Sequence, residues 1–346
     1  MKYSELGTTG IEVSKICLGT MTWGEQNDEK EGHEQLNYAL DHGINFIDTA
    51  ELYSIPPRKA TYGSTETIIG TWIKKRQRRD DFILASKIAG PREGLEYIRE
   101  NGQFSKPQII EALDGSLKRL QTDYIDLYQL HWPVRKTNCF GLLGYPLSGD
   151  DEWNDNFIEV LQTLDEMVKV GKIRYFGVSN ETPWGVMHLT RIAEKYGFPK
   201  IQSIQNPYNL LNRTYEVGLS EISIREQMGL LAYSPLAFGL LSGKYFDNSA
   251  ASDSRINQFP ELSRYNNTLS QEAARQYVQL AKENNISGTQ LALAFINQQN
   301  FVTSNIIGAT TMEQLKENIN SIKIVLDESI IEKINTIHQN IPNPAP

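Results

Sequence analysis

Short apolar segments alternate with longer amphipathic ones along the chain. Eight of the apolar segments have the length and composition of buried strands, and they lie at residues 16–18, 45–47, 82–85, 125–130, 175–178, 201–205, 230–233 and 305–307. An order in which strands and helices alternate predicts parallel strands joined by right-handed crossovers. Eight such strands are the number that a closed (β/α)8 TIM barrel requires.

The amphipathic stretches carry start and stop signals for helices. Gly43 and Gly171 each follow such a stretch, as expected for a glycine just beyond a helix C-terminus. Ser105 is an expected N-cap, and Pro107 lies in the first turn of its helix. The pattern predicts helices at about 31–42, 64–75, from 105 onward, and at 156–170, 182–197, 215–227, 271–297, 312–321 and 328–338, the last being an extra C-terminal helix.

Two features stand apart from the strand–helix alternation. Residues 3–13 have the pattern of an N-terminal β-hairpin, which is placed to close one end of a barrel. Long irregular stretches rich in Gly, Pro, Asn and Ser lie at 88–105, 132–155 and 238–270, and each follows a predicted strand. In a barrel these loops would gather at the C-terminal ends of the strands, where active sites form. Since no linker or repeat interrupts the pattern, residues 1–346 are expected to form a single domain.

The composition excludes several classes of function. Hydrophobic residues make up 40% and charged residues 22% of the 346 positions, as in ordinary globular proteins. A formal net charge of −8 disfavours a nucleic-acid partner, and no apolar run is long enough to cross a membrane. The two cysteines, Cys17 and Cys139, and the lack of a signal-peptide core behind Met1 favour a cytoplasmic protein. The histidines are scattered without HExxH or CxxC motifs, so no metal site is expected.

Four polar residues lie at or just beyond the ends of predicted strands. Asp48 follows the strand at 45–47, Tyr53 comes five positions later, Lys87 follows 82–85, and His131 follows 125–130. Each alone has an ordinary structural explanation, such as a helix cap or a core histidine. Strand ends of a barrel converge on one mouth, however, and a lysine at the end of an apolar strand is costly unless a group such as Asp48 pairs with it.

Such a cluster is suited to carbonyl reduction. A phenol has a pKa of about 10, which is high for a proton donor at neutral pH. A nearby lysine cation is expected to lower the pKa of Tyr53, and an aspartate would hold that lysine in place. A neutral histidine can orient a carbonyl group by hydrogen bonding. Hydride would then reach the carbonyl carbon while Tyr53 protonates the oxygen.

The segments around these residues resemble the signature motifs of the aldo-keto reductase superfamily. They are GINFIDTAELY at 43–53, ASK at 85–87 and LHWP at 130–133, and the resemblance extends from Tyr3 to about His338. It is closest to the bacterial Tas-type branch, which is related to potassium-channel β-subunits, in the segments YSIPP at 53–57 and TNCFG at 137–141. The resemblance implies a TIM barrel that binds NADP(H) without a Rossmann domain, and no GxGxxG motif follows a strand.

The resemblance also implies cofactor contacts. Ser179, Asn180 and Gln205 match positions that bind the nicotinamide amide, and Tyr233 matches the residue that stacks on the nicotinamide ring. Generic turns and caps are the alternative explanation for such stretches, but three matches in the expected order favour a cofactor site. The other implied contacts are Gly19, Thr20 and Met21, the pyrophosphate loop with Ser234, Pro235, Leu236, Ala237, Phe238, Gly239, Leu241, Gly243 and Lys244, and the adenosine-phosphate end with Gly308, Thr310, Gln314, Glu317 and Asn318.

The chain departs from the family pattern at one position. Many members carry a lysine or arginine after the last strand to pair with the 2′-phosphate of NADP, whereas this chain has Thr310 and Thr311. Arg255 or Arg264, in the long loop, would then supply the charge. NADPH is therefore expected ahead of NADH.

The expected substrate is a small carbonyl compound. Trp23, Trp132 and Phe140 are candidate pocket walls, which would favour aromatic or apolar aldehydes, although each residue type is also common in cores and loops. The leading hypothesis is an NADPH-dependent aldehyde or ketone reductase. The alternatives are an NADP(H)-sensing regulatory subunit with little turnover, and an isomerase or aldolase that forms a Schiff base on Lys87.

Overall fold

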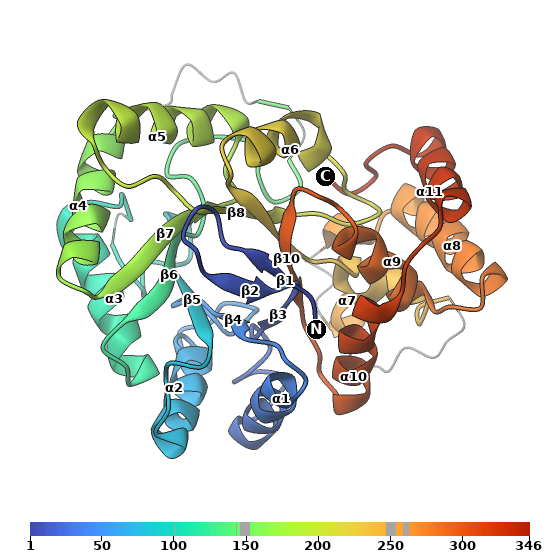
Figure 1. Ribbon diagram of the computed structural model, residues 1–346, viewed down its shortest axis with the longest axis horizontal. Coiled ribbons are helices and arrows are strands. Elements are labelled where there is room, and N and C mark those ends of the chain that lie inside the picture. Colours follow the sequence, from blue (N-terminus) through green and yellow to red (C-terminus); the bar gives the residue numbers. More distant parts are fainter. Residues whose placement is uncertain (101, 143, 146–152, 247–253, 259–262) are drawn as a thin grey trace.

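Eight parallel strands close into a barrel in the order β10-β3-β4-β5-β6-β7-β8-β9 within the described part of the chain (Figure 1). The computed structural model describes residues 1–100, 102–142, 144–145, 153–246, 254–258 and 263–346. The prediction of a (β/α)8 TIM barrel is confirmed, and each predicted strand segment overlaps one barrel strand. These strands are β3 (Ile16–Gly19), β4 (Phe46–Asp48), β5 (Ile83–Ile88), β6 (Ile125–Leu130), β7 (Ile173–Ser179), β8 (Ser203–Pro207), β9 (Gly229–Tyr233) and β10 (Val302–Ile307).

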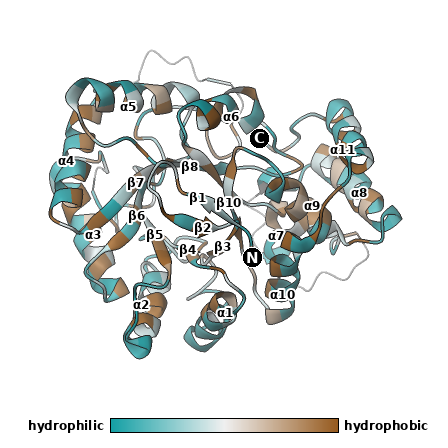
Figure 2. Ribbon diagram, in the orientation of Figure 1, coloured by the Kyte–Doolittle hydropathy of each residue, from teal (hydrophilic) through white to brown (hydrophobic). Residues whose placement is uncertain are grey.

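Helices surround the barrel, and most of them connect one strand to the next. They carry hydrophobic and hydrophilic residues on the same helix, as expected where one face packs on the barrel and the other meets solvent (Figure 2). Among the described residues no helix has the length and apolar character that a membrane span requires. The α-helices are α1 (Glu29–Asp41), α2 (Ser64–Arg76), α3 (Lys106–Leu120), α4 (Phe157–Lys169), α5 (Pro183–Tyr196), α6 (Tyr215–Arg225), α7 (Arg255–Gln258), α8 (Thr268–Glu283), α9 (Gly288–Asn297), α10 (Met312–Asn320) and α11 (Glu328–Asn340).

Two predicted helix features need correction. The stretch predicted at 271–297 is two helices, α8 and α9, because Ser287 caps a new helix in a capping box with Gln290. Ser105 does occupy the N-cap position of α3, but its side chain makes no capping hydrogen bond. The long loop that begins near residue 238 also contains short helices, namely the 3₁₀ helices Ala237–Ser242 and Ser263–Tyr265 and the four-residue α7.

The N-terminal hairpin covers the end of the barrel from which the strands start. Strands β1 (Tyr3–Glu5) and β2 (Glu12–Ser14) pair antiparallel and lie across the opening in Figure 1. Leu6 and Val13 of this hairpin are buried against the apolar side chains that fill the barrel interior. The predicted hairpin and its closing position are therefore confirmed.

Alternation along the strands separates two hydrophobic cores. Side chains pointing outward pack against the helices in one large core, whereas Cys17, Phe46, Ala85, Leu127 and Leu231 fill the interior. Successive residues of a strand point to opposite faces, so the interior side chains recur at every second position. Polar residues take the next inward positions, nearer the C-terminal ends of the strands. The apolar side chains of the interior lie beneath them and form the apolar floor of the barrel mouth.

Candidate active site

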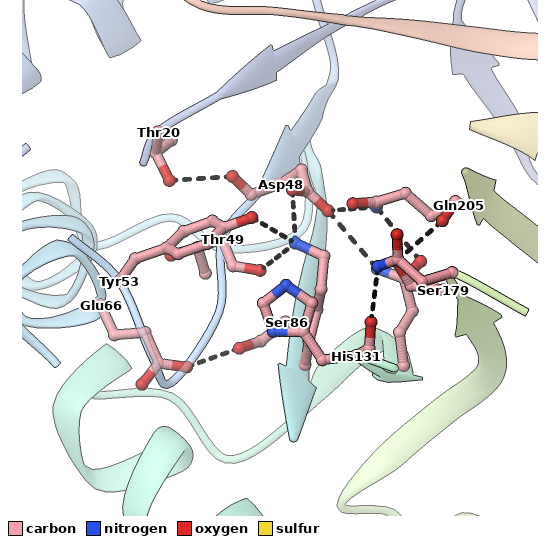
Figure 3. A network of polar contacts seen from close by, with 12 residues as sticks. Thr20, Asp48, Thr49, Tyr53, Glu66, Ser86, His131, Ser179 and Gln205 are labelled. Carbon is pink, nitrogen blue, oxygen red and sulfur yellow. Dashed lines mark hydrogen bonds and ion pairs between the residues drawn. The ribbon is translucent and has the colours of Figure 1, made fainter. Parts of the chain in front are cut away.

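Four strand-end residues meet at the mouth of the barrel (Figure 3). Asp48 ends β4, Lys87 lies on β5, His131 follows β6, and Tyr53 lies on the loop after β4. The Lys87 Nζ atom donates to Asp48 Oδ2 at 2.6 Å and approaches Tyr53 Oη at 3.4 Å. The Tyr53 and His131 rings contact edge to face, with centroids 5.7 Å apart. The residues that were expected to meet thus occupy one site.

The ammonium group of Lys87 is enclosed and paired. The Lys87 residue is 0% exposed and Asp48 is 2% exposed, and Lys87 Nζ also donates to the Thr49 carbonyl at 2.8 Å. Burial acts to lower the pKa of Lys87, but the charges of Asp48 and Tyr53 and their hydrogen bonds outweigh burial and raise it. Lys87 therefore keeps its proton at neutral pH.

The Tyr53 phenol differs from the expectation of a lowered pKa. Its burial raises the pKa above the ordinary value, and this effect exceeds the opposing influence of Lys87. The expectation was wrong in direction because it considered the lysine cation and neglected the loss of water around the phenol. As a consequence, Tyr53 keeps its proton at neutral pH.

His131 is neutral in this environment. Burial, followed by the charge of Lys87, holds the pKa of His131 well below its usual range. Within the described part of the chain, its Nδ1 atom is buried and has no hydrogen-bond partner. An uncharged imidazole beside Tyr53 is able to hydrogen-bond a substrate oxygen without competing for the proton.

Two glutamines complete the surroundings of Asp48, and one of them was missed by the sequence reasoning. Gln205 Nε2 donates to Asp48 Oδ1 at 2.8 Å, and Gln129 Nε2 approaches the same oxygen at 3.4 Å. Gln205 also donates to Gln129 Oε1 at 3.2 Å. Gln129 is a polar residue two positions after Leu127, an apolar inward residue of β6, and this pattern was the available signal.

The residues matched to the nicotinamide site lie beside this cluster, at the ends of β7, β8 and β9. Ser179 Oγ donates to the Gln205 carbonyl at 2.8 Å. Asn180 Nδ2 donates to the His131 carbonyl at 2.9 Å, and Tyr233 Oη donates to Asn180 Oδ1 at 2.6 Å. Asn180 thereby connects the end of β6 with the end of β9. The site presents amide, hydroxyl and aromatic groups within one hydrogen-bonded set.

The loop matched to the pyrophosphate site continues from β9. It contains Pro235, Leu236 and the 3₁₀ helix Ala237–Ser242, and Gly243 follows with a positive φ of 87°. Positive φ values also occur at Ser234, Ala237, Phe238 and Gly239. A Cβ atom added at Gly239 would lie 3.0 Å from Lys244 Cε. The glycine therefore leaves space for the aliphatic part of the Lys244 side chain. Lys244 is thus held close to the backbone of this loop.

The segment matched to the adenosine-phosphate end folds back on itself at α10. Gln314 Oε1 accepts from the Thr310 backbone N–H at 3.0 Å, and Asn318 Nδ2 donates to the Gly308 carbonyl at 3.1 Å. Glu317 instead accepts from Ser287 Oγ at 2.5 Å, which ties α10 to the start of α9. A Cβ atom added at Gly308 would meet no atom within 4 Å, so the backbone there borders open space.

The two loop arginines lie against aromatic rings. The Arg255 guanidinium is 4.6 Å from the centre of the Phe238 ring, and its charge interacts with Tyr53. Burial lowers the pKa of Arg255 to about 10. Arg264 lies 5.9 Å from the centre of the Tyr265 ring. Arg255 is thus held over the Phe238 ring, close enough to Tyr53 for the two groups to interact electrostatically.

The proposed pocket residues separate into different environments. Trp23 is 0% exposed and packs in the core, with its indole N–H donating to Gln35 at 3.3 Å, so its assignment as a pocket wall was wrong. Trp132 contacts His131 with ring centroids 4.9 Å apart, and Phe140 packs edge-on against Trp132 while remaining 44% exposed. Trp132 and Phe140 thus extend outward from the reaction centre.

Gly19 at the end of β3 and the next two residues also border the mouth. A Cβ atom at Gly19 would lie 2.9 Å from the Ile307 carbonyl oxygen, so a glycine is needed where β3 meets β10. Thr20 Oγ1 donates to the Asp48 carbonyl at 2.8 Å. Met21 packs in a small apolar cluster with Tyr53 and Trp132.

Comparison with known proteins assigns this barrel to a family. Residues 15–339 match the model described as "Aldo/keto reductase family". The chain is 48% identical to "Protein tas" of Escherichia coli over 100% of both chains. It is 35% identical to the "Uncharacterized oxidoreductase YrpG" of Bacillus subtilis over 100% of this chain and 97% of that protein. It is also 33% identical to the "Aldo-keto reductase YhdN" of the same organism over 98% and 94% of the two chains. The match to the family model and the full-length similarity to a Tas protein confirm the resemblance found in the motifs: the chain belongs to the aldo/keto reductase family.

Proposed function

We propose that this protein reduces aldehydes or ketones to alcohols with NADPH, and that Tyr53 delivers the proton to the carbonyl oxygen. The observation that supports the proposal most directly is the enclosed chain of contacts from Asp48 through Lys87 to Tyr53. Tyr53 keeps its proton at neutral pH, and the ammonium group of Lys87, which also keeps its proton, acts against the effect of burial and stabilises the phenolate that forms when Tyr53 gives up its proton.

Each residue of the cluster has a separate role in the proposed reaction. Tyr53 protonates the oxygen as negative charge develops there, and Lys87 stabilises the phenolate that remains. Asp48 fixes Lys87 and balances its charge. His131, which is neutral, donates a hydrogen bond that orients the carbonyl group. The apolar floor and the surrounding rings exclude water, which strengthens each of these interactions.

The donor set fits a nicotinamide nucleotide. Ser179, Asn180 and Gln205 offer groups for a carboxamide, and Tyr233 offers a ring face. Lys244 and the N-terminus of α10 favour phosphate groups. A bound nicotinamide would supply the hydride. The preference for NADPH rests on Arg255 or Arg264 as the partner of a 2′-phosphate, since Thr310 and Thr311 are uncharged.

The substrate is proposed to be an apolar or aromatic carbonyl compound. Trp132 and Phe140 form a continuous aromatic path from His131 toward solvent. Such a path would pack against an apolar substituent while the carbonyl oxygen lies between Tyr53 and His131.

A Schiff-base mechanism on Lys87 is disfavoured by the geometry. An amine nucleophile must lose its proton, and such lysines have a lowered pKa. Lys87 has a raised pKa and donates to Asp48, to the Thr49 carbonyl and to Tyr53.

The test combines turnover with cofactor binding. Purified protein is mixed with NADPH and a panel of aldehydes and ketones, and the loss of reduced-nicotinamide absorbance is followed. We expect turnover, and we expect Tyr53→Phe to lower kcat by about 10²- to 10⁴-fold while NADPH binding stays unchanged. Tyr97→Phe is the matched control because Tyr97 lies in the same apolar cluster and its buried hydroxyl has no partner among the described residues.

Two outcomes would count against the proposal. A Tyr53→Phe variant with wild-type kcat would exclude Tyr53 as the donor. Tight NADPH binding without turnover on any carbonyl compound would favour a cofactor-sensing regulatory subunit instead.

A further inference from the structure

A buried ion pair lies next to the reaction centre and takes no part in the proposed chemistry. The carboxylate of Glu51 accepts hydrogen bonds from Arg99 Nη1 at 3.0 Å and from Arg99 Nη2 at 2.8 Å. The Glu51 side chain is 0% exposed and that of Arg99 is 7% exposed. Glu51 lies between Asp48 and Tyr53 on the turn after β4, and Arg99 comes from the long loop after β5. The pair thus connects two loops of the barrel mouth.

Glu51 also bonds directly to the backbone around Lys87. Its own N–H donates to the Lys87 carbonyl at 3.2 Å, and its carboxylate accepts from the Ala89 N–H at 2.6 Å. The two contacts lie on either side of Ile88, the last residue of β5, so Glu51 is bound to the end of the strand that carries Lys87. The turn that carries Tyr53 is therefore fixed to the strand that carries Lys87.

Apolar contacts reinforce this connection. Ala50 and Leu52, the neighbours of Glu51, pack with Tyr53 in a cluster that includes Ala89 and Leu95 from the β5 loop. Burial raises the pKa of Glu51, while Arg99 and the Ala89 N–H act in the opposite direction. A buried carboxylate is costly to leave unpaired, so Arg99 is needed to hold the carboxylate in its charged, hydrogen-bonding form.

We propose that Glu51 and Arg99 are positioning residues, which set the separation between the Tyr53 phenol and the Lys87 ammonium group. That separation is 3.4 Å, and Lys87 stabilises the phenolate only at short range. Errors of about 1 Å in a reacting geometry lower rates by about 100-fold. For its kinetic readout the proposal rests on the proposed reductase function, whereas a second readout is independent of that function.

The test uses Glu51→Gln, which retains an oxygen for the Ala89 N–H and loses the ion pair, and Arg99→Lys, which retains the charge and loses the two-pronged contact. Asp126→Asn is the matched control. Asp126 is 1% exposed, pairs with Arg79, and accepts from the Leu84 N–H of the same strand β5 at 3.0 Å, but at the other end of the barrel.

The first readout is kinetic. At saturating NADPH and carbonyl compound, we expect Glu51→Gln to lower kcat by about 10- to 100-fold with the Kd for NADPH unchanged, and Arg99→Lys to keep a larger part of the activity. Asp126→Asn is expected to lower the thermal midpoint as much as Glu51→Gln does while kcat stays near wild type. A Glu51→Gln variant with wild-type kcat, or an equal loss of kcat in Asp126→Asn, would overturn the proposal.

The second readout needs no turnover. Protein labelled with [ζ-¹³C]tyrosine gives one signal per ring, and the Tyr53 signal is identified by its absence in Tyr53→Phe. We expect the chemical shift of this signal to change in Glu51→Gln and to stay the same in Asp126→Asn. Only Glu51→Gln is expected to alter the separation between the Tyr53 phenol and the Lys87 ammonium group. If the wild-type protein reduces no carbonyl compound, the proposed function fails, and the ¹³C signal still decides on the positioning role: an unmoved signal in Glu51→Gln refutes it.

Discussion

Removing Lys87 should destabilise the protein more than removing both members of its ion pair. In Lys87→Met the Asp48 carboxylate loses the cation that pairs with it at 2.6 Å and stays enclosed, with hydrogen bonds from Gln205 and Gln129. Breaking a buried pair in this way costs about 3–5 kcal/mol, because an uncompensated charge remains. In the double variant Asp48→Asn/Lys87→Met no charge is left behind, so a large part of this loss should be recovered.

The coupling between the two positions is measurable. Contacting residues show interaction energies of about 0.5–3 kcal/mol, and a fully buried ion pair belongs at the upper end. Urea unfolding of the wild type, both single variants and the double variant, followed by tryptophan fluorescence, gives this energy. As a control, Lys169→Met removes an ion pair with Asp165 in which the lysine is 72% exposed, and it should cost less than about 1 kcal/mol.

Stability and activity are expected to separate in these variants. The double variant should regain stability without regaining turnover, because Tyr53 still lacks the cation that stabilises its phenolate. If the free-energy losses of the single variants simply add in the double variant, the ion pair does not act as a buried unit and the electrostatic account is refuted.

Further predictions concern pH, packing and capping. The pKa of His131 is held well below its usual range in the folded state. The free energy of unfolding is therefore highest above the unfolded pKa of about 6.5 and decreases as the pH falls. In urea titrations, the wild type should lose about 1.4 kcal/mol more of this free energy than His131→Asn between pH 7.5 and 5.5. Gly70→Ala would bring a Cβ atom 2.1 Å from the Arg119 carbonyl oxygen, and it should lower the unfolding free energy by at least about 1–3 kcal/mol in the same assay. Ser287→Ala removes the cap of α9 and a bond to Glu317, which should cost about 1–2 kcal/mol; an unchanged thermal midpoint would show that this cap is dispensable.

The strands were predictable because barrel strands are buried on both faces and leave continuous apolar runs in the sequence. The prediction missed the first half of β10, which begins at Val302 and not at 305. Thr303, Ser304 and Asn305 lie inside this strand and concealed its start. Ser304 donates to the Ser14 carbonyl and Asn305 to Asn297. These partners are distant in the sequence, so no local pattern could show that the polar side chains would be satisfied.

The grouping of the site residues was predictable from the sequence, but their environment was not. Asp48, Lys87 and His131 could be placed together because the ends of parallel strands share one edge, and Tyr53 followed from its closeness to Asp48. The environment of these groups could not be predicted, since the pKa of Tyr53 depends on how completely the fold removes water from it. The pairing of Glu51 with Arg99 joins residues 48 positions apart and likewise appears only in the folded chain.

The hairpin at the base of the barrel has a consequence for the order of events. Leu6 and Val13 pack against the apolar side chains of the interior, so the end of the barrel at which the strands begin is closed by described residues. Under the proposed function, the nucleotide and the carbonyl compound would both enter and leave at the opposite end, where the strands end. Two molecules that share one entrance are expected to bind in a fixed order, with the deeper one arriving first and departing last, and product-inhibition patterns would show this order.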